Sequence, residues 1–207
     1  MPDKSVDLVL TDPPYGISIN KMSFTKNEKV VKNALCNSTD YRGMAEWDTE
    51  RIAKEYFVEM FRISKNQIIF GGNYYTDMLP PTNGWIIWDK ITNIKYRNLF
   101  ADCELAWCSK GVARIYPWLW KGMIQENMKN KDRRIYPTQK PVGLFCNLLM
   151  DFTKETDLVF DPFMGSGTTG VSCANLGRRF VGCEINPKSF EIAKKRIEAA
   201  RAQTRLF

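Results

Sequence analysis

The chain has 207 residues, 44% of them hydrophobic and 26% charged, which suits one globular domain with its own core. It has no run of 18 apolar residues that would span a membrane and no signal peptide at its start, so we expect a cytoplasmic protein. The net charge of +7 favours an acidic partner such as nucleic acid, while the lack of histidine and of any C-x-x-C pair excludes His-dependent nucleophiles and argues against a metal site.

Short apolar runs bounded by turn residues recur along the chain and predict buried strands. They are rich in β-branched and aromatic residues and cover residues 6–10, 67–70, 85–88, 104–107, 157–160 and 180–183. Helical patterns lie between several of them, over residues 48–64, 141–153, 167–177 and 186–203. Because strands alternate with helices, we expect an α/β fold with a mainly parallel sheet.

Two stretches depart from this alternation. Residues 17–47 are polar and have no sustained period, so we expect a mobile or functional loop there. Residues 110–136 read as a small insertion in a single domain that covers 1–207. Aromatic residues in this insertion suit either stacking on bases or packing in a core, and its basic residues are candidates for contact with DNA phosphates: Lys121, Lys129, Lys131, Arg133 and Arg134.

A glycine pattern follows the strand predicted at 157–160. Gly165, Gly167 and Gly170 fit G-x-G-x-x-G, and Glu184 ends the next strand. Glycines let the backbone approach a ligand closely, and an acidic residue at this distance can accept hydrogen bonds from ribose hydroxyls. The pattern predicts a nucleoside cofactor but does not by itself distinguish a dinucleotide from other nucleosides.

Four motifs together resemble the β group of the S-adenosylmethionine-dependent DNA amino-methyltransferases, in which the catalytic motif precedes the cofactor motifs. They are DPPY at 12–15, YPTQKP at 136–141, DPFMGSGTTG at 161–170 and FVGCEIN at 180–186. The resemblance covers nearly the whole chain and implies a Rossmann-like sheet that is mostly parallel with one antiparallel strand. Because the catalytic strand already begins at residue 6, we expect the family's N-terminal edge strand to be missing or shortened.

The resemblance implies that the chain methylates the N6 amino group of adenine in DNA, after the base has been swung out of the duplex. The amino nitrogen is a poor nucleophile, and hydrogen-bond acceptors around its N–H bonds would favour methylation. Asp12 would offer a carboxylate and Pro13 a carbonyl oxygen, while Pro14 fixes the turn and Tyr15 stacks on the base.

The cofactor residues are also implied by the resemblance. Thr138, Gln139 and Lys140 would lie near the methionine carboxylate of S-adenosylmethionine, and Glu184 would bind its ribose. The remaining implied cofactor residues are Asp161, Phe163, Gly165, Ser166, Gly167 and Asn186. The stretch GGN at 71–73 follows a strand, and we expect it to face the same site.

Several alternatives stay open. Cytosine-N4 methylation is the nearest, because the Asp of DPPY favours adenine without excluding cytosine. A dinucleotide-dependent oxidoreductase would explain the glycines but not DPPY or TQKP, and a non-catalytic DNA-binding protein would explain neither Asp12 nor Tyr15. A bacterial or phage-encoded origin, a role inside or outside restriction-modification, and a monomeric or homodimeric state are all compatible with the sequence.

Overall fold

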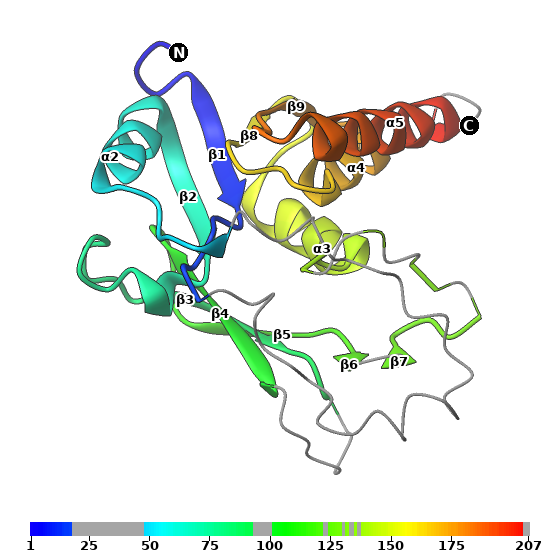
Figure 1. Cartoon of the computed structure of the whole chain (residues 1–207), viewed down its shortest axis with the longest axis horizontal. Helices are drawn as coiled ribbons and strands as arrows, with labels where there is room; N and C mark the ends of the chain where they lie inside the picture. The colour runs from blue at the N-terminus through cyan, green and yellow to red at the C-terminus, as the bar shows by residue number, and fades with distance from the viewer. Residues whose placement is uncertain are drawn as a thin grey trace.

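The computed structural model describes residues 1–17, 48–92, 101–121, 124–129, 131–132, 135 and 138–204. A seven-stranded sheet crosses the molecule in the order β5-β3-β4-β2-β1-β8-β9 (Figure 1). From residue 18 onward, the loop predicted over 17–47 lies outside the described residues. No helix in the described ranges is long and apolar enough to cross a membrane.

Six of the seven strands lie where the apolar runs predicted them. They are β1 (Val6–Thr11), β2 (Ser64–Phe70), β3 (Gly84–Asp89), β4 (Cys103–Cys108), β8 (Leu158–Asp161) and β9 (Arg179–Gly182). β4 pairs antiparallel with both β2 and β3, and the other pairings described in this sheet are parallel. The prediction of a mostly parallel sheet with one antiparallel strand is therefore confirmed.

The seventh strand was not predicted from the sequence. β5 (Arg114–Pro117) pairs parallel with β3 and forms one edge of the sheet, while β9 forms the other. β6 (Trp120–Lys121) and β7 (Ile124–Gln125) make a separate two-stranded sheet. The segment 110–136 thus begins as part of the main sheet.

The four described α-helices agree with the helical patterns except at one start. They are α2 (Lys54–Ile63), α3 (Val142–Phe152), α4 (Thr168–Asn175) and α5 (Pro187–Thr204). The pattern over 48–64 predicted a longer first helix. Its predicted start was wrong, because α2 begins at Lys54. Asp48 instead accepts hydrogen bonds from the turn after β1, and Arg51 forms a β-bridge with Tyr15 in that turn.

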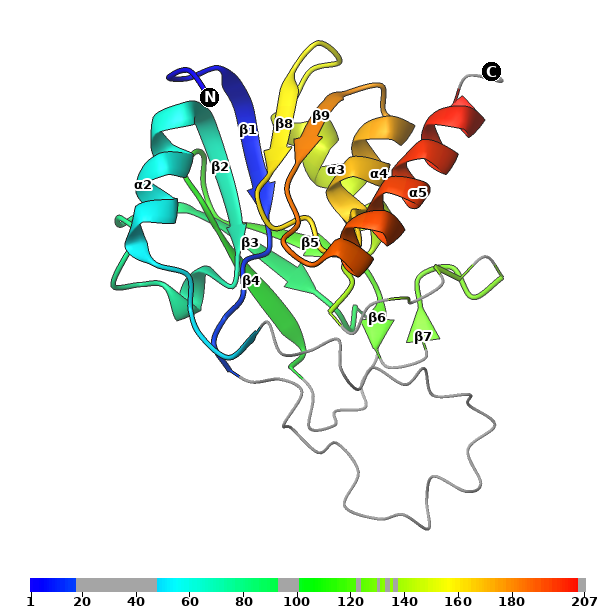
Figure 2. The same ribbon diagram turned by 45° about the horizontal axis from the view of Figure 1, so that its top comes forward.

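Helices cover both faces of the sheet, as the view in Figure 2 shows. Successive side chains of a strand point to opposite faces, so β1 contributes to two cores. Leu8 and Leu10 belong to the core beneath α3 and α4, whereas Val9 belongs to the core beneath α2. α5 packs on α4, where a Cβ on Gly170 would lie only 2.4 Å from Cδ1 of Ile197.

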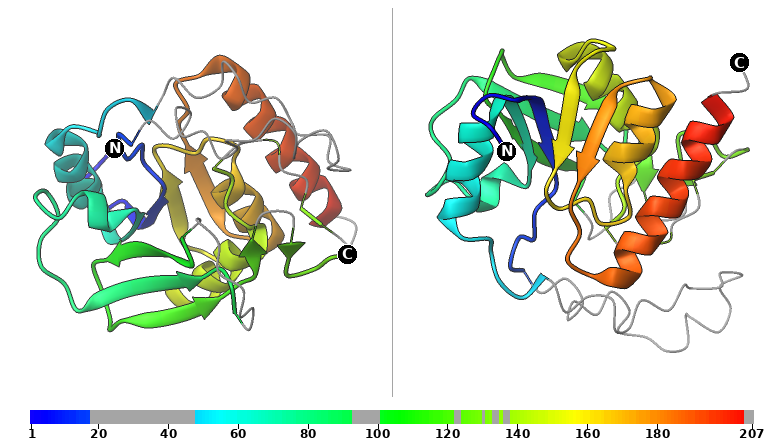
Figure 3. Two further views of the ribbon diagram at one scale, coloured as in Figure 1. Left: turned by 60° about the horizontal axis from the view of Figure 1, so that its bottom comes forward. Right: turned by 90° about the horizontal axis from the view of Figure 1, so that it is seen from above.

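The order of the strands defines where a ligand can bind. From β1 the chain continues through α2 to the neighbouring β2, and from β8 it continues through α4 to β9 on the other side (Figure 3). β1 and β8 are adjacent and parallel, so the strand order reverses between them. In open α/β sheets, ligands bind outside the carboxyl ends of the strands at such a switch point.

Candidate active site

A cavity of ≈ 330 Å³ opens at the carboxyl ends of β1 and β8. Residues from all four sequence motifs line it, although they are up to 173 positions apart, from Asp12 to Ile185. The predicted site residues among its lining are Asp12, Pro14, Thr138, Gln139, Lys140, Asp161, Phe163, Gly165, Ser166 and Glu184. The fold therefore brings these predicted residues into one place, while Pro13, Tyr15, Gly167 and Asn186 are not among the described lining residues.

The glycine-rich loop forms one wall of the cavity. Gly165 has φ +49°, and a Cβ added to it would meet nothing within 4 Å, so the backbone lies open to a ligand. Gly167 has φ +80° and lies close to Ala193 of α5. Arg196 of α5 donates a hydrogen bond to the carbonyl oxygen of Ser166 at 2.5 Å and so supports the loop from behind.

Asp161 joins β8 to its neighbours at the floor of the cavity. Its two carboxylate oxygens accept hydrogen bonds from the hydroxyls of Thr11 at 2.7 Å and Thr169 at 2.6 Å. The backbone N–H of Phe163 donates a further one at 3.1 Å. Burial raises the pKa of Asp161 to about 6, although these hydrogen bonds act to lower it. Asp161 thus holds β1, the glycine loop and α4 together as well as lining the cavity.

Glu184 lines the cavity from the end of β9, where the sequence placed a ribose-binding carboxylate. Its carboxylate accepts hydrogen bonds from the backbone N–H groups of Gly165 at 2.9 Å and Asn186 at 2.8 Å. Asn186 is absent from the described lining. Its Oδ1 instead accepts hydrogen bonds from the backbone N–H groups of Lys188 and Ser189, in the first turn of α5.

The DPPY turn is held by groups from outside the motif. The carboxylate of Asp48, which is buried, accepts hydrogen bonds from the backbone N–H groups of Tyr15 at 2.8 Å and Gly16 at 2.9 Å. The hydroxyl of Tyr75 donates to the carbonyl oxygen of Pro14. Asp48 was not predicted as a site residue; its only local signal is its position directly after the irregular segment.

Tyr15 has contacts that differ from those expected of a free stacking ring. Its hydroxyl donates a hydrogen bond to Oδ1 of Asp12. Its ring stacks on Tyr74 with centroids 4.8 Å apart, and a Cβ on Gly71 would lie 2.0 Å from its Cε1. Neither Gly71 nor Gly72 is among the described lining residues, so GGN supports the Tyr15 ring and the prediction that it faces the cavity was wrong.

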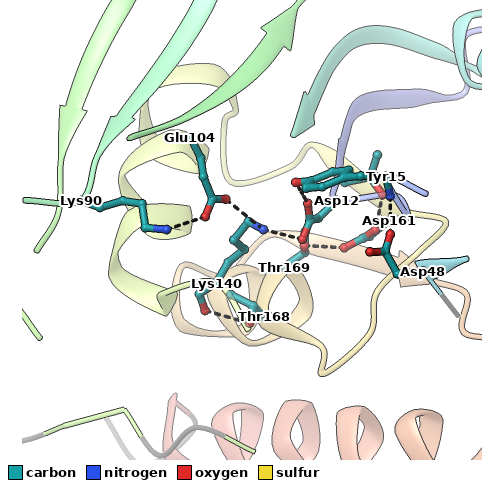
Figure 4. Close-up of polar contacts among 10 residues, drawn as sticks. Asp12, Tyr15, Asp48, Lys90, Glu104, Lys140, Asp161, Thr168 and Thr169 are labelled. Atoms are coloured by element: carbon teal, nitrogen blue, oxygen red, sulfur yellow. Dashed lines mark hydrogen bonds and ion pairs between the residues drawn. The ribbon is translucent and has the colours of Figure 1, made fainter. Parts of the chain in front are cut away.

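Lys140 lies beside the carboxylate of Asp12 (Figure 4). Its Nζ donates to Oδ2 of Asp12 at 2.6 Å and lies 3.2 Å from Oε2 of Glu104. The resemblance implied a place near the methionine carboxylate, and although Lys140 does line the cavity, its ammonium is engaged with protein carboxylates. Glu104 was missed by the sequence analysis; a charged residue inside the apolar run CELAWC was the available signal.

The described residues of the basic and aromatic segment 110–136 do not form one surface. Lys121, a predicted DNA contact, is buried with its Nζ 3.8 Å from Asp102. Tyr116 and Trp120 are buried members of the core, which decides for core packing rather than base stacking at these two residues. Lys129 and Lys131 are exposed, and Arg133 and Arg134 lie outside the described residues.

Comparisons with known proteins agree with this geometry. A family model described as DNA methylase matches residues 72–195. The Type II methyltransferase M2.DpnII of Streptococcus pneumoniae is 42% identical over 96% of this chain and 85% of its own length. The Type II methyltransferase M.HinfI of Haemophilus influenzae is 27% identical over 95% of this chain, which spans 64% of the length of that relative. A crystal structure of an M1.HpyAVI–SAM complex has a TM-score of 0.54 at 23% identity, and the match covers 94% of this chain and 89% of that one.

Proposed function

Because the chain belongs to the DNA methylase family, we propose that it transfers a methyl group from S-adenosylmethionine to the N6 amino group of adenine in DNA. The observation that carries this proposal is the position of Asp12. Its carboxylate stands at the end of β1 and borders the cavity that the glycine loop and Glu184 also line. Asp12, which can accept a hydrogen bond from an amino group, therefore borders the same cavity as the residues suited to a nucleoside cofactor.

The residues present fit S-adenosylmethionine. Gly165 leaves its side of the loop open to a ligand, and the carboxylate of Glu184 is held at the same wall by two backbone N–H groups. When bound, this cofactor supplies a methyl group on a positively charged sulfur, which is already activated for attack by nitrogen. The residues that would hold it are Phe163, Gly165, Ser166 and Glu184, with Thr138 and Gln139 across the cavity.

Asp12 acts on the amino group of the base. An ionised carboxylate only accepts hydrogen bonds, so Asp12 draws an N–H proton of the substrate and favours a tetrahedral nitrogen. Within the described residues, no hydrogen bond reaches the carbonyl oxygen of Pro13, which leaves it available as the second acceptor. Tyr15 orients Asp12 through its hydroxyl, and Asp48 fixes the turn that carries all three.

The target base must leave the duplex to reach this site, because its amino group is otherwise paired. Asp12 and the Pro13 carbonyl would accept hydrogen bonds from the amino group of cytosine as well. Cytosine-N4 methylation is therefore the second candidate, and the Asp at the first position of the motif favours adenine over it.

The product base decides between the two. We expect DNA incubated with the protein and methyl-labelled S-adenosylmethionine to yield labelled N6-methyladenine after digestion to nucleosides. Asp12→Ala should abolish the label, while Asp3→Ala, at an exposed carboxylate far from the cavity, should leave it unchanged. Labelled N4-methylcytosine would replace the adenine assignment, and full activity of Asp12→Ala would overturn the mechanism.

A further inference from the structure

Four charged side chains of alternating sign run from the cavity into the sheet (Figure 4). Asp12 receives a hydrogen bond from Lys140 at 2.6 Å, and Lys140 lies 3.2 Å from Glu104. Lys90 donates to the other oxygen of Glu104 at 2.8 Å. Each of these side chains is between 7% and 26% exposed, and each comes from a different segment of the chain.

This arrangement is costly for the fold alone. Removing ions from water costs several kcal/mol per ion, and an apolar residue of similar size is often as stable or more stable at such a position. Glu104 stands in β4 between apolar neighbours, and together with Lys90 it extends the Asp12–Lys140 pair by two further partly buried charges. A role in the site accounts for these charges better than a role in folding.

Resting on the methyl-transfer function above, we propose that Lys140 keeps Asp12 ionised as the acceptor for the base, and that Glu104 is a positioning residue that fixes Lys140 and limits its hold on Asp12. A protonated Asp12 would donate through one oxygen and lose much of its power as an acceptor. If the ammonium of Lys140 bonded to Asp12 alone, it would compete with the amino group of the substrate for the lone pairs of the Asp12 carboxylate. Glu104, on the other side of Lys140, prevents this.

The protonation states are consistent with a fixed row of charges rather than a proton relay. Burial lowers the pKa of Lys140, but Asp12 and Glu104 outweigh it and raise that pKa overall. Burial raises the pKa of Glu104, but Lys140 and Lys90 outweigh it and lower that pKa. For Asp12, burial and the nearby Glu104 raise the pKa, Lys140 and Tyr15 lower it, and the net direction is upward. Lys140 and Glu104 therefore stay charged while Asp12 titrates.

The ionisable groups that face Asp12 come from several elements. Tyr15 and Tyr75 stay neutral, because burial raises the pKa of both hydroxyls. Asp161 titrates near pH 6 and contributes equally to the wild type and to variants that leave it untouched. The groups to be considered together are Tyr15, Tyr75, Asp161, Glu104 and Lys140.

The test measures Asp12 directly, without DNA. The full chain is labelled with ¹³C at the aspartate carboxyl groups, the Asp12 resonance is assigned with Asp12→Asn, and its pKa is measured by NMR. We expect Lys140→Gln to raise this pKa by about one unit or more. Glu104→Gln should lower it by about half a unit, because a negative charge is lost while Lys140 stays. Calorimetry should give the same S-adenosylmethionine affinity for both variants as for the wild type.

Matched controls remove similar ion pairs elsewhere. Lys65→Gln, which breaks a 2.7 Å pair with Asp7, and Glu59→Gln, which breaks a pair with Arg62, should leave the Asp12 pKa unchanged. If Lys140→Gln does not fold, the double variant Lys140→Gln/Glu104→Gln removes one charge of each sign. Its Asp12 pKa should still lie above the wild-type value, though below that of Lys140→Gln.

Three results would overturn the proposal. They are an Asp12 pKa that Lys140→Gln does not raise, a Glu104→Gln shift in the same direction as that of Lys140→Gln, and a loss of S-adenosylmethionine affinity in Lys140→Gln. In the methylation assay, the pH at which the rate falls on the acidic side of the pH–rate profile should shift together with the Asp12 pKa. If the wild-type protein methylated no base, that result would contradict the proposed function. The NMR titration would still decide whether Lys140 and Glu104 control the Asp12 pKa.

Discussion

Asp48 fixes the DPPY turn from outside the motif. Its buried carboxylate accepts two backbone N–H groups, from Tyr15 and Gly16. Asp48→Ala should reduce the free energy of unfolding by about 1–3 kcal/mol, because two partly buried N–H donors lose their acceptor. It should also lower kcat by roughly 100-fold through misplacement of Asp12, with unchanged S-adenosylmethionine affinity.

Asp48→Asn is the matched control for this prediction. Its amide oxygen keeps one acceptor without the charge, so the variant should fall between the wild type and Asp48→Ala in both chemical denaturation and single-turnover rate. A normal rate in Asp48→Ala would show that the turn does not depend on this carboxylate.

Asp161 predicts how stability depends on pH. Its pKa is raised from 3.8 to about 6 by burial, so the folded state binds this proton more tightly than the unfolded state. The stabilisation is complete below about pH 4 and is lost as pH rises through 6. Between pH 4 and pH 7, the unfolding free energy of the wild type should fall by roughly 2–3 kcal/mol relative to that of Asp161→Asn.

Urea denaturation of both proteins at several pH values provides the measurement. Groups remote from Asp161 titrate alike in the two proteins and cancel in the difference, whereas Asp12 is coupled to Asp161 and is removed from both by Asp12→Asn. A difference that stays constant from pH 4 to pH 7, or rises with pH, would contradict the raised pKa.

Residues that belong to local motifs were predictable, and residues that act through tertiary pairing were not. Gly165 and Glu184 stand at strand ends that the sequence marks clearly, and both line the cavity. Glu104 and Asp48 meet their partners Lys140 and Tyr15 only after the chain has folded. Lys140 lines the cavity where it was expected, but its contacts with Asp12 and Glu104 were not predicted, since no local pattern reveals a carboxylate from another strand.

At the scale of elements, the contact between α4 and α5 depends on a missing side chain. A Cβ on Gly170 would lie 2.4 Å from Cδ1 of Ile197 and 2.7 Å from Cε1 of Phe180. Gly170→Ala should therefore lower the unfolding free energy by about 1–3 kcal/mol, because the core is overpacked. Ile197→Val removes Cδ1, so the double variant should lose less than the sum of the two single variants in a double-mutant cycle.

Ala174→Gly, at the buried end of α4, is the comparison for this cycle. It changes the same helix without adding volume, so it should show no coupling to Ile197→Val. Additive losses for Gly170→Ala and Ile197→Val would mean that α5 moves away freely and that close packing is not the reason for the glycine.

Strands with continuous apolar runs were predicted, and the strand without one was missed. β5 has exposed, exposed, buried and exposed side chains in turn and ends at Pro117, which resembles a loop in sequence. It becomes a strand by pairing with β3, and no local sequence pattern predicts this pairing. The start of α2 was misplaced for a similar reason, since Arg51 pairs with Tyr15 rather than starting a helix.

At the scale of the whole molecule, the sheet order joins motifs that the sequence keeps apart. β1 lies beside β8, which carries the glycine loop, although residues 12–157 separate the two strands in the sequence. The hydrogen bond from Thr11 to Asp161, at 2.7 Å, ties these two strands together at the cavity floor. A ligand that fills the cavity therefore contacts both halves of the fold and should stabilise it as a unit.

This stabilisation can be measured and assigned to the glycine loop. At 100 times its Kd, S-adenosylmethionine should add about 2.7 kcal/mol to the unfolding free energy, which corresponds to a rise in Tm of roughly 5–10 °C. Gly165→Val should abolish the rise, because its side chain enters the cavity. Gly111→Val is the matched control, since Gly111 also has a positive φ, of +92°, and open space around it, but lies outside this cavity. Both variants should lose stability from backbone strain without cofactor, and only Gly111→Val should regain it with cofactor; an equal response in the two would place the cofactor elsewhere.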